Sequence, residues 1–452
     1  MFSFAAVALL AMGANWGLAL PIERGESAAS ASPRHVLVVS VDGLGASWLT
    51  HPPPNLHIPN FKRLMEEGSY AEGVWSVYPS LTYPAHTTMV TGRMPAEHGI
   101  YSNLSSREAG KNSKDWFWFS NAIKVPTLWD LARQNNLTTS SVFWSVTVGG
   151  PINWNIPEIW DPAKGMAGDP LYVAKFATPG LLFEAALELG PPQGASDDVM
   201  KVKLTGFVLK KHQPNLLMLH LAELDGALHQ RGPASPEAAA AVEKADERIG
   251  ELLTAVKAAG LENKTDVFIV SDHGFLSVER SISPNVLLAR AGLITADENG
   301  NVTGGKVFTM ADGGSFFISW PESQNLRADV EAAIHPLRDE GALYGELGRE
   351  ALKDLGAEPA AQIALEAPSA ASFDSKASGE VIQKLPQTTG THGHLPFRPG
   401  LAASFIAWGP HIKKGGALGH IPMTAIGPTL LKALGIEKGQ LGPHPPLDQI
   451  FK

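Results

Sequence analysis

The sequence predicts an α/β fold in which a mostly parallel central sheet lies between layers of helices. Apolar runs of strand length alternate along the chain with amphipathic segments of helical period, which is the pattern of successive βαβ units. In addition, Asp or His residues follow several of these runs directly. Because the carboxyl ends of parallel strands meet at one edge of a sheet, where ligands bind, we expect these residues to converge there.

Residues 1–31 are interpreted as a secretory signal peptide that precedes the fold. Residues 2–20 are mostly apolar, and the triplet at 29–31 fits a small-residue cleavage site. No Lys or Arg precedes Arg24, so an uncleaved membrane anchor or a disordered leader is the alternative. Later apolar runs stay below the ~18 residues that a spanning helix needs. We therefore expect a secreted or periplasmic protein with no stable membrane insertion after removal of the signal.

The first elements of the fold are marked by apolar content and by residues typical of helix ends. Residues 36–41 form a nearly continuous apolar run and predict a buried strand. Residues 58–65 predict a short helix, with Pro59 in its first turn and Gly68 beyond its end. Residues 79–92 contain a second predicted helix.

The remaining elements continue the alternation of strand and helix. The segment 238–259 is the clearest helix, because Val242, Ile249 and Val256 recur on one face at helical spacing. The others are, in chain order, a helix over 127–135, strands over 139–144, 216–221, 267–271 and 405–408, and a final helix over 423–434.

Two stretches break this alternation and are interpreted as insertions that cap the sheet. Residues 104–200 are rich in Trp, Pro and Gly, and residues 281–386 carry weak strand patterns and an Ala-rich segment. The aromatic residues of the first stretch are either core or the wall of a pocket that holds a base, a lipid or an aryl group.

Composition excludes several classes of protein. Apolar residues make up 44% of the chain and charged residues 18%, which is a globular balance with ample material for a core. The net charge of −9 argues against binding to nucleic acid duplexes, which needs a basic face. The absence of Cys excludes disulfides and zinc held by thiolates. Small anionic substrates remain compatible, because bound metals supply positive charge locally.

Three carboxylates and three imidazoles stand just past the strand-like runs or between glycines. These donors suit Zn²⁺ or a similar borderline cation. Six such ligands exceed the need of one tetrahedral ion, so the set predicts two metals, an arrangement that attacks and releases phosphoryl groups. The six residues are Asp42, Asp225, His229, Asp272, His273 and His392.

The segment around Thr82 suggests a nucleophile. Pro84 suits the first turn of a helix, which places Thr82 at or just before the helix N-terminus. Free backbone N–H groups and the helix dipole favour an anion there. A hydroxyl bound to a metal can ionise and attack phosphorus. The alternative, that Thr82 only caps the helix, is the commoner role in this context, but the metal ligands elsewhere favour the nucleophile.

Further histidines are left outside the predicted metal set. His220 lies inside a predicted strand and is interpreted as a buried His whose hydrogen bonds are satisfied. His86 is expected to pack near the helix of Thr82. His394 is expected to touch substrate or to support a metal ligand.

Five segments resemble, in order, the motifs of the type I phosphodiesterase / nucleotide pyrophosphatase family, which belongs to the alkaline phosphatase superfamily. Each segment alone is a weak signal, but five in order are a strong one. The resemblance spans roughly residues 35–435. The segments are Val41-Asp42-Gly43, Pro79-Ser80-Leu81-Thr82-Tyr83-Pro84-Ala85-His86, Asp225-Gly226-Ala227-Leu228-His229, Ser271-Asp272-His273-Gly274 and Thr391-His392-Gly393.

The resemblance implies an alkaline-phosphatase-like α/β/α sandwich and a specific division of labour in the site. Thr82 would form a phospho-threonine intermediate, Asn103 would bind a phosphoryl oxygen, and Tyr83 would stack on a nucleobase. Two zinc ions are implied, although other divalent metals would also fit. The first would be held by Asp42, Thr82, Asp272 and His273, and the second by Asp225, His229 and His392.

The expected function is that of a two-metal hydrolase that cleaves phosphodiester or pyrophosphate bonds in small, nucleotide-type phosphate esters. Residues 32–452 would form its single catalytic domain. Animal members often carry Lys at the position of Leu81 and Asn at that of Ala85, which puts the preference for nucleotides in doubt. The alternatives are a phosphomonoesterase or phosphonate hydrolase of the same superfamily, and a secreted, non-catalytic metal- or ligand-binding protein.

Overall fold

The structure is a computed structural model that describes residues 34–105, 116–164, 169–190 and 198–452. The predicted signal peptide, residues 1–31, lies outside the described residues. From Arg34 onward the chain forms one unit. None of the helices in these ranges is both long and apolar enough to cross a lipid bilayer.

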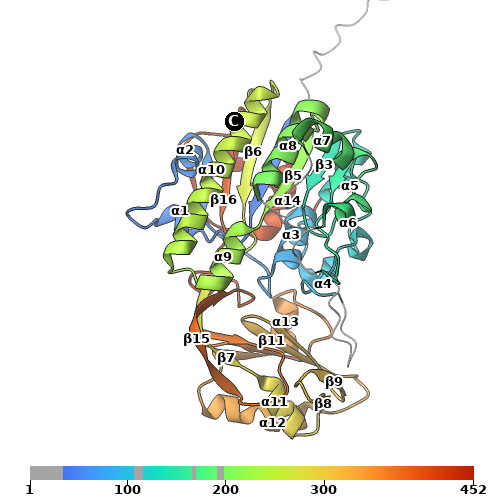
Figure 1. Ribbon diagram of the computed structural model, residues 1–452, viewed down its shortest axis with the longest axis vertical. Coiled ribbons are helices and arrows are strands. Elements are labelled where there is room, and N and C mark those ends of the chain that lie inside the picture. The colour runs from blue at the N-terminus through green and yellow to red at the C-terminus, as the bar shows by residue number, and fades with distance from the viewer. Residues whose placement is uncertain (1–33, 106–115, 165–168, 191–197) are drawn as a thin grey trace, which may run out of the picture. The chain divides into compact units, whose positions relative to one another are not determined.

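An eight-stranded, mostly parallel sheet forms the centre of the fold (Figure 1). Strand β16 is antiparallel to both of its neighbours, while the other pairs in this sheet are parallel. The buried run predicted over 36–41 is the central strand β1, paired on one side with β5 and on the other with β6. The strand order is β17 (Gly416–Pro422), β2 (Ser69–Trp75), β16 (Phe405–Trp408), β6 (Thr265–Val270), β1 (His35–Val41), β5 (Leu216–Leu221), β3 (Thr139–Val142) and β4 (Trp154–Ile156).

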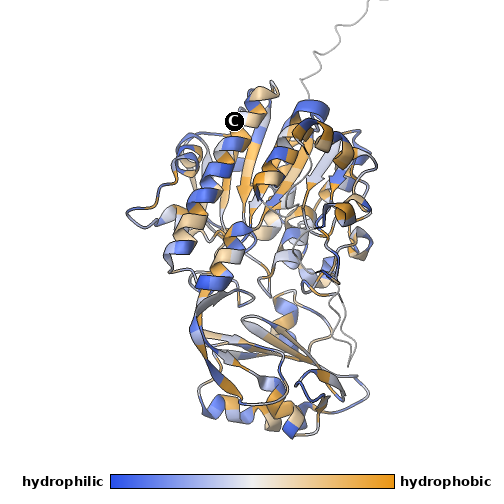
Figure 2. Ribbon diagram, viewed as in Figure 1, coloured by the Kyte–Doolittle hydropathy of each residue, from blue (hydrophilic) through white to orange (hydrophobic). Residues whose placement is uncertain are grey.

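Helices cover both faces of this sheet, which gives the predicted α/β/α sandwich. Alternate residues of a strand point to opposite faces, so Leu37 and Val39 lie in one apolar cluster and Val36 and Val38 in the other. Most residues of the central strands β1, β5 and β6 are apolar, and Figure 2 shows this part of the sheet as largely hydrophobic. The first cluster includes α2 (Pro59–Glu67), α8 (Asp198–His212), α9 (Glu223–Arg231) and α10 (Pro236–Ala258), and the second includes α3 (Thr82–Thr91), α5 (Leu128–Gln134) and α14 (Ile426–Ala433).

The second predicted insertion, 281–386, corresponds to a region with sheets and a core of its own, which we call the cap (Figure 1). It leaves the main sheet along β7 (Leu276–Ile282) and returns along β15 (Ile382–Thr391), and these two strands pair with each other. The other cap elements are α11 (Pro284–Arg290), β8 (Ile294–Ala296), β9 (Val302–Gly305), β10 (Phe308–Asp312), β11 (Ser315–Ser319), α12 (Arg327–Asp339), β12 (Gly345–Gly348), α13 (Arg349–Asp354), β13 (Ile363–Glu366) and β14 (Ala370–Phe373).

The structure differs from the expectation of a cap over residues 104–200. Strands β3 and β4 extend the main sheet beyond β5, so this stretch contributes to the core of the sandwich. Strand β4 has three residues, which is too short for a periodic signal in the sequence. The other helices of the described ranges are α1 (Ser47–Thr50), α4 (Pro95–His98), α6 (Pro170–Ala174) and α7 (Leu181–Leu189).

Candidate active site

The six predicted ligands converge beyond the carboxyl ends of the central strands. Asp42 follows β1, Asp272 and His273 follow β6, and His392 follows β15, which returns from the cap. Asp225 and His229 lie on α9, which begins just after β5. One turn of helix separates them, so both side chains leave the same face. The strand-end rule therefore brings together residues that are far apart in sequence.

The first group of ligands is buried and lies between the central strands. His273 Nε2 is 3.5 Å from Asp42 Oδ1 and 3.2 Å from Asp272 Oδ2, and the exposed fractions of these three side chains are 0%, 5% and 0%. The backbone N–H groups of Gly43 and His273 donate to Asp272 Oδ1. By contrast, Asp42 Oδ1, Asp272 Oδ2 and both nitrogens of His273 have no hydrogen-bond partner.

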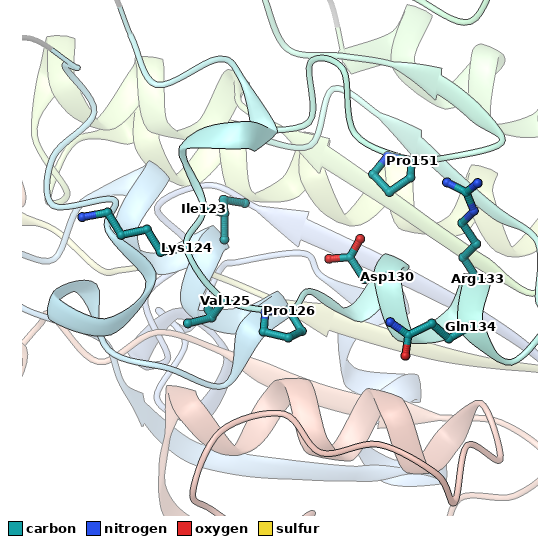
Figure 3. A pocket seen from close by; sticks show the side chains of 8 residues that line it. All are labelled: Ile123, Lys124, Val125, Pro126, Asp130, Arg133, Gln134 and Pro151. Atoms are coloured by element: carbon teal, nitrogen blue, oxygen red, sulfur yellow. The ribbon is translucent and has the colours of Figure 1, made fainter.

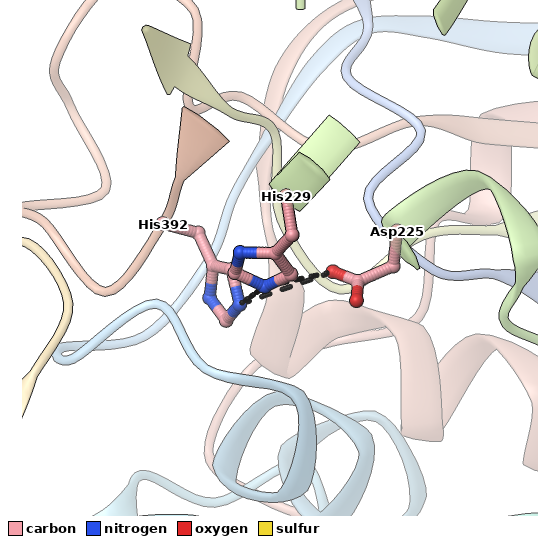
Figure 4. A group of neighbouring side chains, drawn as sticks. All are labelled: Asp225, His229 and His392. Carbon is pink, nitrogen blue, oxygen red and sulfur yellow. Dashed lines mark hydrogen bonds and ion pairs between the residues drawn. The ribbon is translucent and has the colours of Figure 1, made fainter. Parts of the chain in front are cut away.

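The second group is more exposed and is built from the helix α9 and the strand β15 (Figure 4). The Nε2 atoms of His229 and His392 are 3.2 Å apart, and Asp225 Oδ1 is 3.6 Å from His229 Nε2. The Nδ1 atoms donate outward, from His229 to the Gly390 carbonyl at 3.1 Å and from His392 to the Ser80 carbonyl at 2.8 Å. These bonds fix the tautomer in which Nε2 carries the lone pair that binds a metal.

Both groups fit a divalent cation. Buried polar atoms normally have partners, so orphaned oxygens and nitrogens that face one another indicate a missing positive charge. Asp42, Asp225 and His273 also form a group, with one ligand atom of each within 4.8 Å of the others. Asp225 therefore lies close to both groups, whereas the sequence assigned it to the second metal alone.

The electrostatics of the cluster support this interpretation. Burial, and then the neighbouring carboxylate Asp272, raise the pKa of Asp42 well above its ordinary value. Burial also raises the pKa of Asp225. Burial, and then the other imidazoles of the cluster, lower the pKa of His392 well below its usual range. The protein alone thus penalises two carboxylate charges that a divalent cation would stabilise.

Thr82 is the first residue of α3 and is almost fully buried. The N-cap is Leu81, whose side chain makes no capping bond, so the alternative role of Thr82 as an N-cap is not what the structure has. Asn103 Oδ1 accepts the backbone N–H of Tyr83 at 2.9 Å, which holds the predicted phosphoryl-binding amide against the start of this helix.

The segment that carries Thr82 is bonded directly to a ligand of the second group and reaches the first group through His86. The Ser80 carbonyl accepts from His392 Nδ1. On the other side, His86 Nδ1 donates to the Thr82 carbonyl at 2.8 Å and lies 3.8 Å from Asp272 Oδ2. The predicted nucleophile therefore stands between residues that contact one ligand from each group.

Tyr83 has no exposed ring face that a nucleobase could stack on. The residue is fully buried, and its ring lies 5.1 Å from that of Trp116 in an edge-on arrangement. A cavity of about 460 Å³ lies nearby and is lined by aromatic residues of the first insertion, for which the sequence predicts either core or pocket wall. This cavity adjoins Asn103, whose carbonyl accepts the N–H of Phe117.

Two polar clusters were not predicted as parts of the site. His220 is buried and satisfied, as expected, but its Nε2 atom contacts Asp42 Oδ2 at 2.9 Å and its Nδ1 atom contacts Glu158 Oε2 at 3.0 Å. Burial would lower the pKa of His220, but the carboxylates of Glu158 and Asp42 outweigh it and raise the pKa to about 10. Glu158 carries no local sequence signal, because it comes from a loop of the stretch interpreted as an insertion.

The second cluster joins His394 to the cap. His394 Nδ1 lies 2.9 Å and Arg398 Nη1 3.1 Å from Glu366 Oε1, and all three residues are buried. The Ser80 hydroxyl donates to the His394 carbonyl, which connects this cluster to the segment before Thr82. A separate cavity, shown in Figure 3, is lined by Lys124, Asp130, Arg133 and their neighbours, and none of the predicted ligands lines it.

The central sheet and the cluster of carboxylates and imidazoles at its edge define a member of the alkaline phosphatase superfamily. The chain belongs to the type I phosphodiesterase / nucleotide pyrophosphatase family, because the profile of that family matches residues 36–393.

Individual relatives are more distant. Bis(5′-adenosyl)-triphosphatase of Bos taurus is 29% identical over 259 residues, which are 56% of this chain and 49% of the relative. Ectonucleotide pyrophosphatase/phosphodiesterase family member 1 of Homo sapiens is 26% identical over 248 residues, 53% of this chain and 23% of the relative. The chain thus spans about half or less of these curated relatives.

Solved structures match over nearly the whole chain. Human ectonucleotide pyrophosphatase/phosphodiesterase 5 superposes with a TM-score of 0.66 and 20% identity, over 92% of this chain and 98% of the other. An inactive threonine-to-alanine variant of the murine protein, in complex with AMP, gives the same TM-score at 19% identity, with coverage of 92% and 98%. At this identity the likeness establishes the alkaline-phosphatase-like fold.

Proposed function

We propose that the protein is a metal-dependent hydrolase that cleaves phosphodiester or pyrophosphate bonds through a phospho-threonine intermediate at Thr82. The observation that carries the proposal is the position of the Thr82 segment, which is bonded on one side to His392 through Ser80 and on the other side to His86, next to Asp272. These contacts support a position of the Thr82 segment beside both carboxylate–imidazole groups, and a hydroxyl that binds a metal ion there would be activated for attack on phosphorus.

The residues of the two groups would hold two divalent cations, zinc being the best fit to their donors. Asp42, Asp272 and His273, with Thr82, would hold the first, and Asp225, His229 and His392 the second. Such cations, when bound, lower the pKa of a coordinated hydroxyl and offset negative charge on the phosphoryl and leaving oxygens. Asp225 lies close enough to both groups to contribute to the field at either position.

In the proposed reaction Thr82 acts as the nucleophile and Asn103 binds a phosphoryl oxygen. Thr82 Oγ1 loses its proton to solvent and attacks phosphorus, and the bond to the leaving oxygen breaks with its electron pair on that oxygen. Asn103 Oδ1 is occupied by the Tyr83 N–H, so the Asn103 Nδ2 amide is the group that donates to a phosphoryl oxygen. Water then attacks the phosphorus of the Thr82 adduct from the side that the leaving group vacated and gives up a proton to solvent. The bond from phosphorus to Thr82 Oγ1 breaks with its electron pair on Oγ1, which takes up a proton from solvent.

Small nucleotide-type phosphate esters are the proposed substrates, in a secreted or periplasmic setting. The curated relatives are named as a bis(5′-adenosyl)-triphosphatase and a nucleotide pyrophosphatase/phosphodiesterase, and a murine structural neighbour binds AMP. The net charge of −9 disfavours nucleic acid duplexes as substrates. Because Tyr83 is buried, we assign base recognition to other residues, with the aromatic cavity beside Asn103 as the nearest candidate.

Substrate class is tested by comparing three rates in the presence of zinc. The substrates are p-nitrophenyl phosphate, the p-nitrophenyl ester of a nucleoside monophosphate, and a dinucleoside pyrophosphate. We expect kcat/KM for the diester or the pyrophosphate to exceed that for the monoester by ~100-fold or more, because the sequence neighbours of Thr82, Leu81 and Tyr83, offer no cationic side chain to compensate the extra charge of a monoester. A monoester preference would establish a phosphomonoesterase instead, and no turnover with metal bound would establish a binding protein.

A further inference from the structure

A buried histidine, His220, contacts one of the proposed metal ligands. His220 stands on β5 level with Ser40 on β1, two residues before Asp42. The rest of β5 is apolar and fully buried, so an imidazole at this position needs hydrogen-bond partners to offset its desolvation. The partners of the His220 ring are Asp42 Oδ2 at 2.9 Å and Glu158 Oε2 at 3.0 Å.

Both ring nitrogens of His220 lie at hydrogen-bond distance from carboxylate oxygens, Nε2 from Asp42 and Nδ1 from Glu158. The orientation of the ring is therefore fixed from both sides. Glu158 is itself held in place, because the Ser145 hydroxyl donates to the same Oε2 atom at 2.9 Å. The result is a continuous chain from Ser145 through Glu158 and His220 to Asp42.

This row of hydrogen bonds occupies one carboxyl oxygen of Asp42 and leaves the other without a hydrogen-bond partner. His220 occupies Oδ2, whereas Oδ1 is buried, has no hydrogen-bond partner and lies 3.5 Å from His273 Nε2. We propose that His220, backed by Glu158, is a positioning residue that orients Asp42 so that Oδ1 alone faces the first cation. This inference rests on the proposed function for one point, the role of Asp42 as a metal ligand.

A purely structural role would look different. His35 on β1 is another buried histidine, and it is satisfied by a single bond from Nδ1 to the Pro214 carbonyl at 2.8 Å. His220 instead contacts two carboxyl groups, those of Asp42 and Glu158, one at each ring nitrogen. Side chains of this kind behind a metal ligand typically change metal affinity or activity by ~10–100-fold when removed.

The test compares His220→Gln and Glu158→Gln with the matched control His35→Gln. Each protein is freed of metal and titrated with zinc against a chromophoric chelator, and kcat, KM and the thermal midpoint are measured in parallel. We expect His220→Gln to weaken the tighter zinc site and to lower kcat by ~10–100-fold, with KM within about twofold. Glu158→Gln should show a smaller loss in the same direction, about tenfold or less. His35→Gln should keep both the zinc affinity and kcat.

The outcomes separate this inference from the proposed function. If His220→Gln and Glu158→Gln both keep wild-type zinc affinity and kcat, the inference is wrong while the proposed function stands. If His220→Gln fails to fold, Glu158→Gln carries the test, because it keeps the size and hydrogen-bonding capacity of the side chain. A wild-type chain that binds no zinc and hydrolyses no phosphate ester would overturn both.

Discussion

The two ligand groups contain the same types of donor, carboxylate and imidazole, but different parts of the fold hold them in place. Asp42, Asp272 and His273 follow neighbouring strands of the central sheet and are buried. In the second group, Asp225 is 21% and His229 42% exposed, and both come from a helix that packs against the strand returning from the cap. Sheet register therefore positions the first group, whereas the second depends on how the cap meets the core.

The two groups should therefore differ in how much activity is lost when a ligand is substituted. A buried ligand that is removed leaves charged neighbours without water to replace it, which is costly. An exposed ligand can be replaced by solvent at the cost of part of the affinity. Loss of a ligand should therefore lower activity more in the first group than in the second. Metal binding by the second group should also change when the cap is altered and the sheet is left intact.

The largest expected effect comes from removing one histidine of each group in turn. We predict that His273→Ala lowers kcat/KM by ~10³-fold or more, and that His229→Ala lowers it by about tenfold less than that, because water can occupy the exposed position. The measurement is kcat/KM for a nucleoside-monophosphate diester together with zinc content per chain. Equal losses, or a larger loss for His229→Ala, would contradict the division into a buried and an exposed group.

A smaller effect is expected when Gly314 is substituted, in the turn of the cap that contacts the second group. The Gly314 N–H donates to the His392 carbonyl at 2.8 Å, and a Cβ atom at Gly314 would lie 2.1 Å from His394 Cγ. Gly314→Ala should therefore displace the His392 loop and destabilise the protein by ~1–3 kcal/mol, while releasing the more weakly bound zinc first.

Gly345→Ala is the matched control for this change. It lies in the same cap, and a Cβ atom there would meet nothing within 4 Å. Zinc content and the free energy of unfolding are measured for both variants. Loss of zinc in the control, or full occupancy of both sites in Gly314→Ala, would show that cap docking does not govern the second group.

The smallest effect concerns acid stability and tests a histidine outside both groups. The Ile100 N–H donates to His98 Nδ1, so His98 Nε2 is the donor to Thr88 Oγ1 and the ring is neutral. Burial lowers the pKa of His98 to about 3. The unfolded chain therefore binds a proton below its ordinary pKa near ~6.5 that the folded chain excludes, and stability is lost as the pH falls through this window.

We predict that lowering the pH from 7 to 5 costs the wild type ~2 kcal/mol more than it costs His98→Gln, measured by urea unfolding of the metal-free proteins. Metal-free protein removes the contribution of ligand binding to stability. An identical loss in both proteins would show that acid destabilisation arises elsewhere, for example in the buried ligand groups themselves.

Much of the fold and of the site could be predicted because both leave local signals. Each of the strands β1, β5 and β6 is a short apolar run, and a ligand or the helix that carries it follows at once. The position of Thr82 follows from the proline two residues later. The strand-end rule for parallel sheets then places these residues together without knowledge of the loops.

The remaining features depend on contacts between distant segments, which a single sequence does not encode locally. Glu158 reaches His220 from a loop after β4, and Glu366 reaches His394 from the cap. The sequence predicts the strand at 139–144, but β4, at the edge of the main sheet, has only three residues and leaves no periodic signal, so the sequence does not show that this stretch extends the sheet. The burial of Tyr83 likewise follows from its packing against Trp116, which lies in another part of the chain.

The central claim is that Thr82 becomes covalently bonded to phosphorus during turnover. The most direct measurement is rapid acid quench of the zinc-loaded protein with a nucleoside-monophosphate diester, followed by mass spectrometry of the peptide that spans residues 79–92. We predict that a phosphoryl adduct carrying the nucleoside appears on Thr82 in the wild type, and that Thr82→Ala shows neither the adduct nor turnover. Turnover by Thr82→Ala at the wild-type rate, or an adduct on another residue, would contradict the claim.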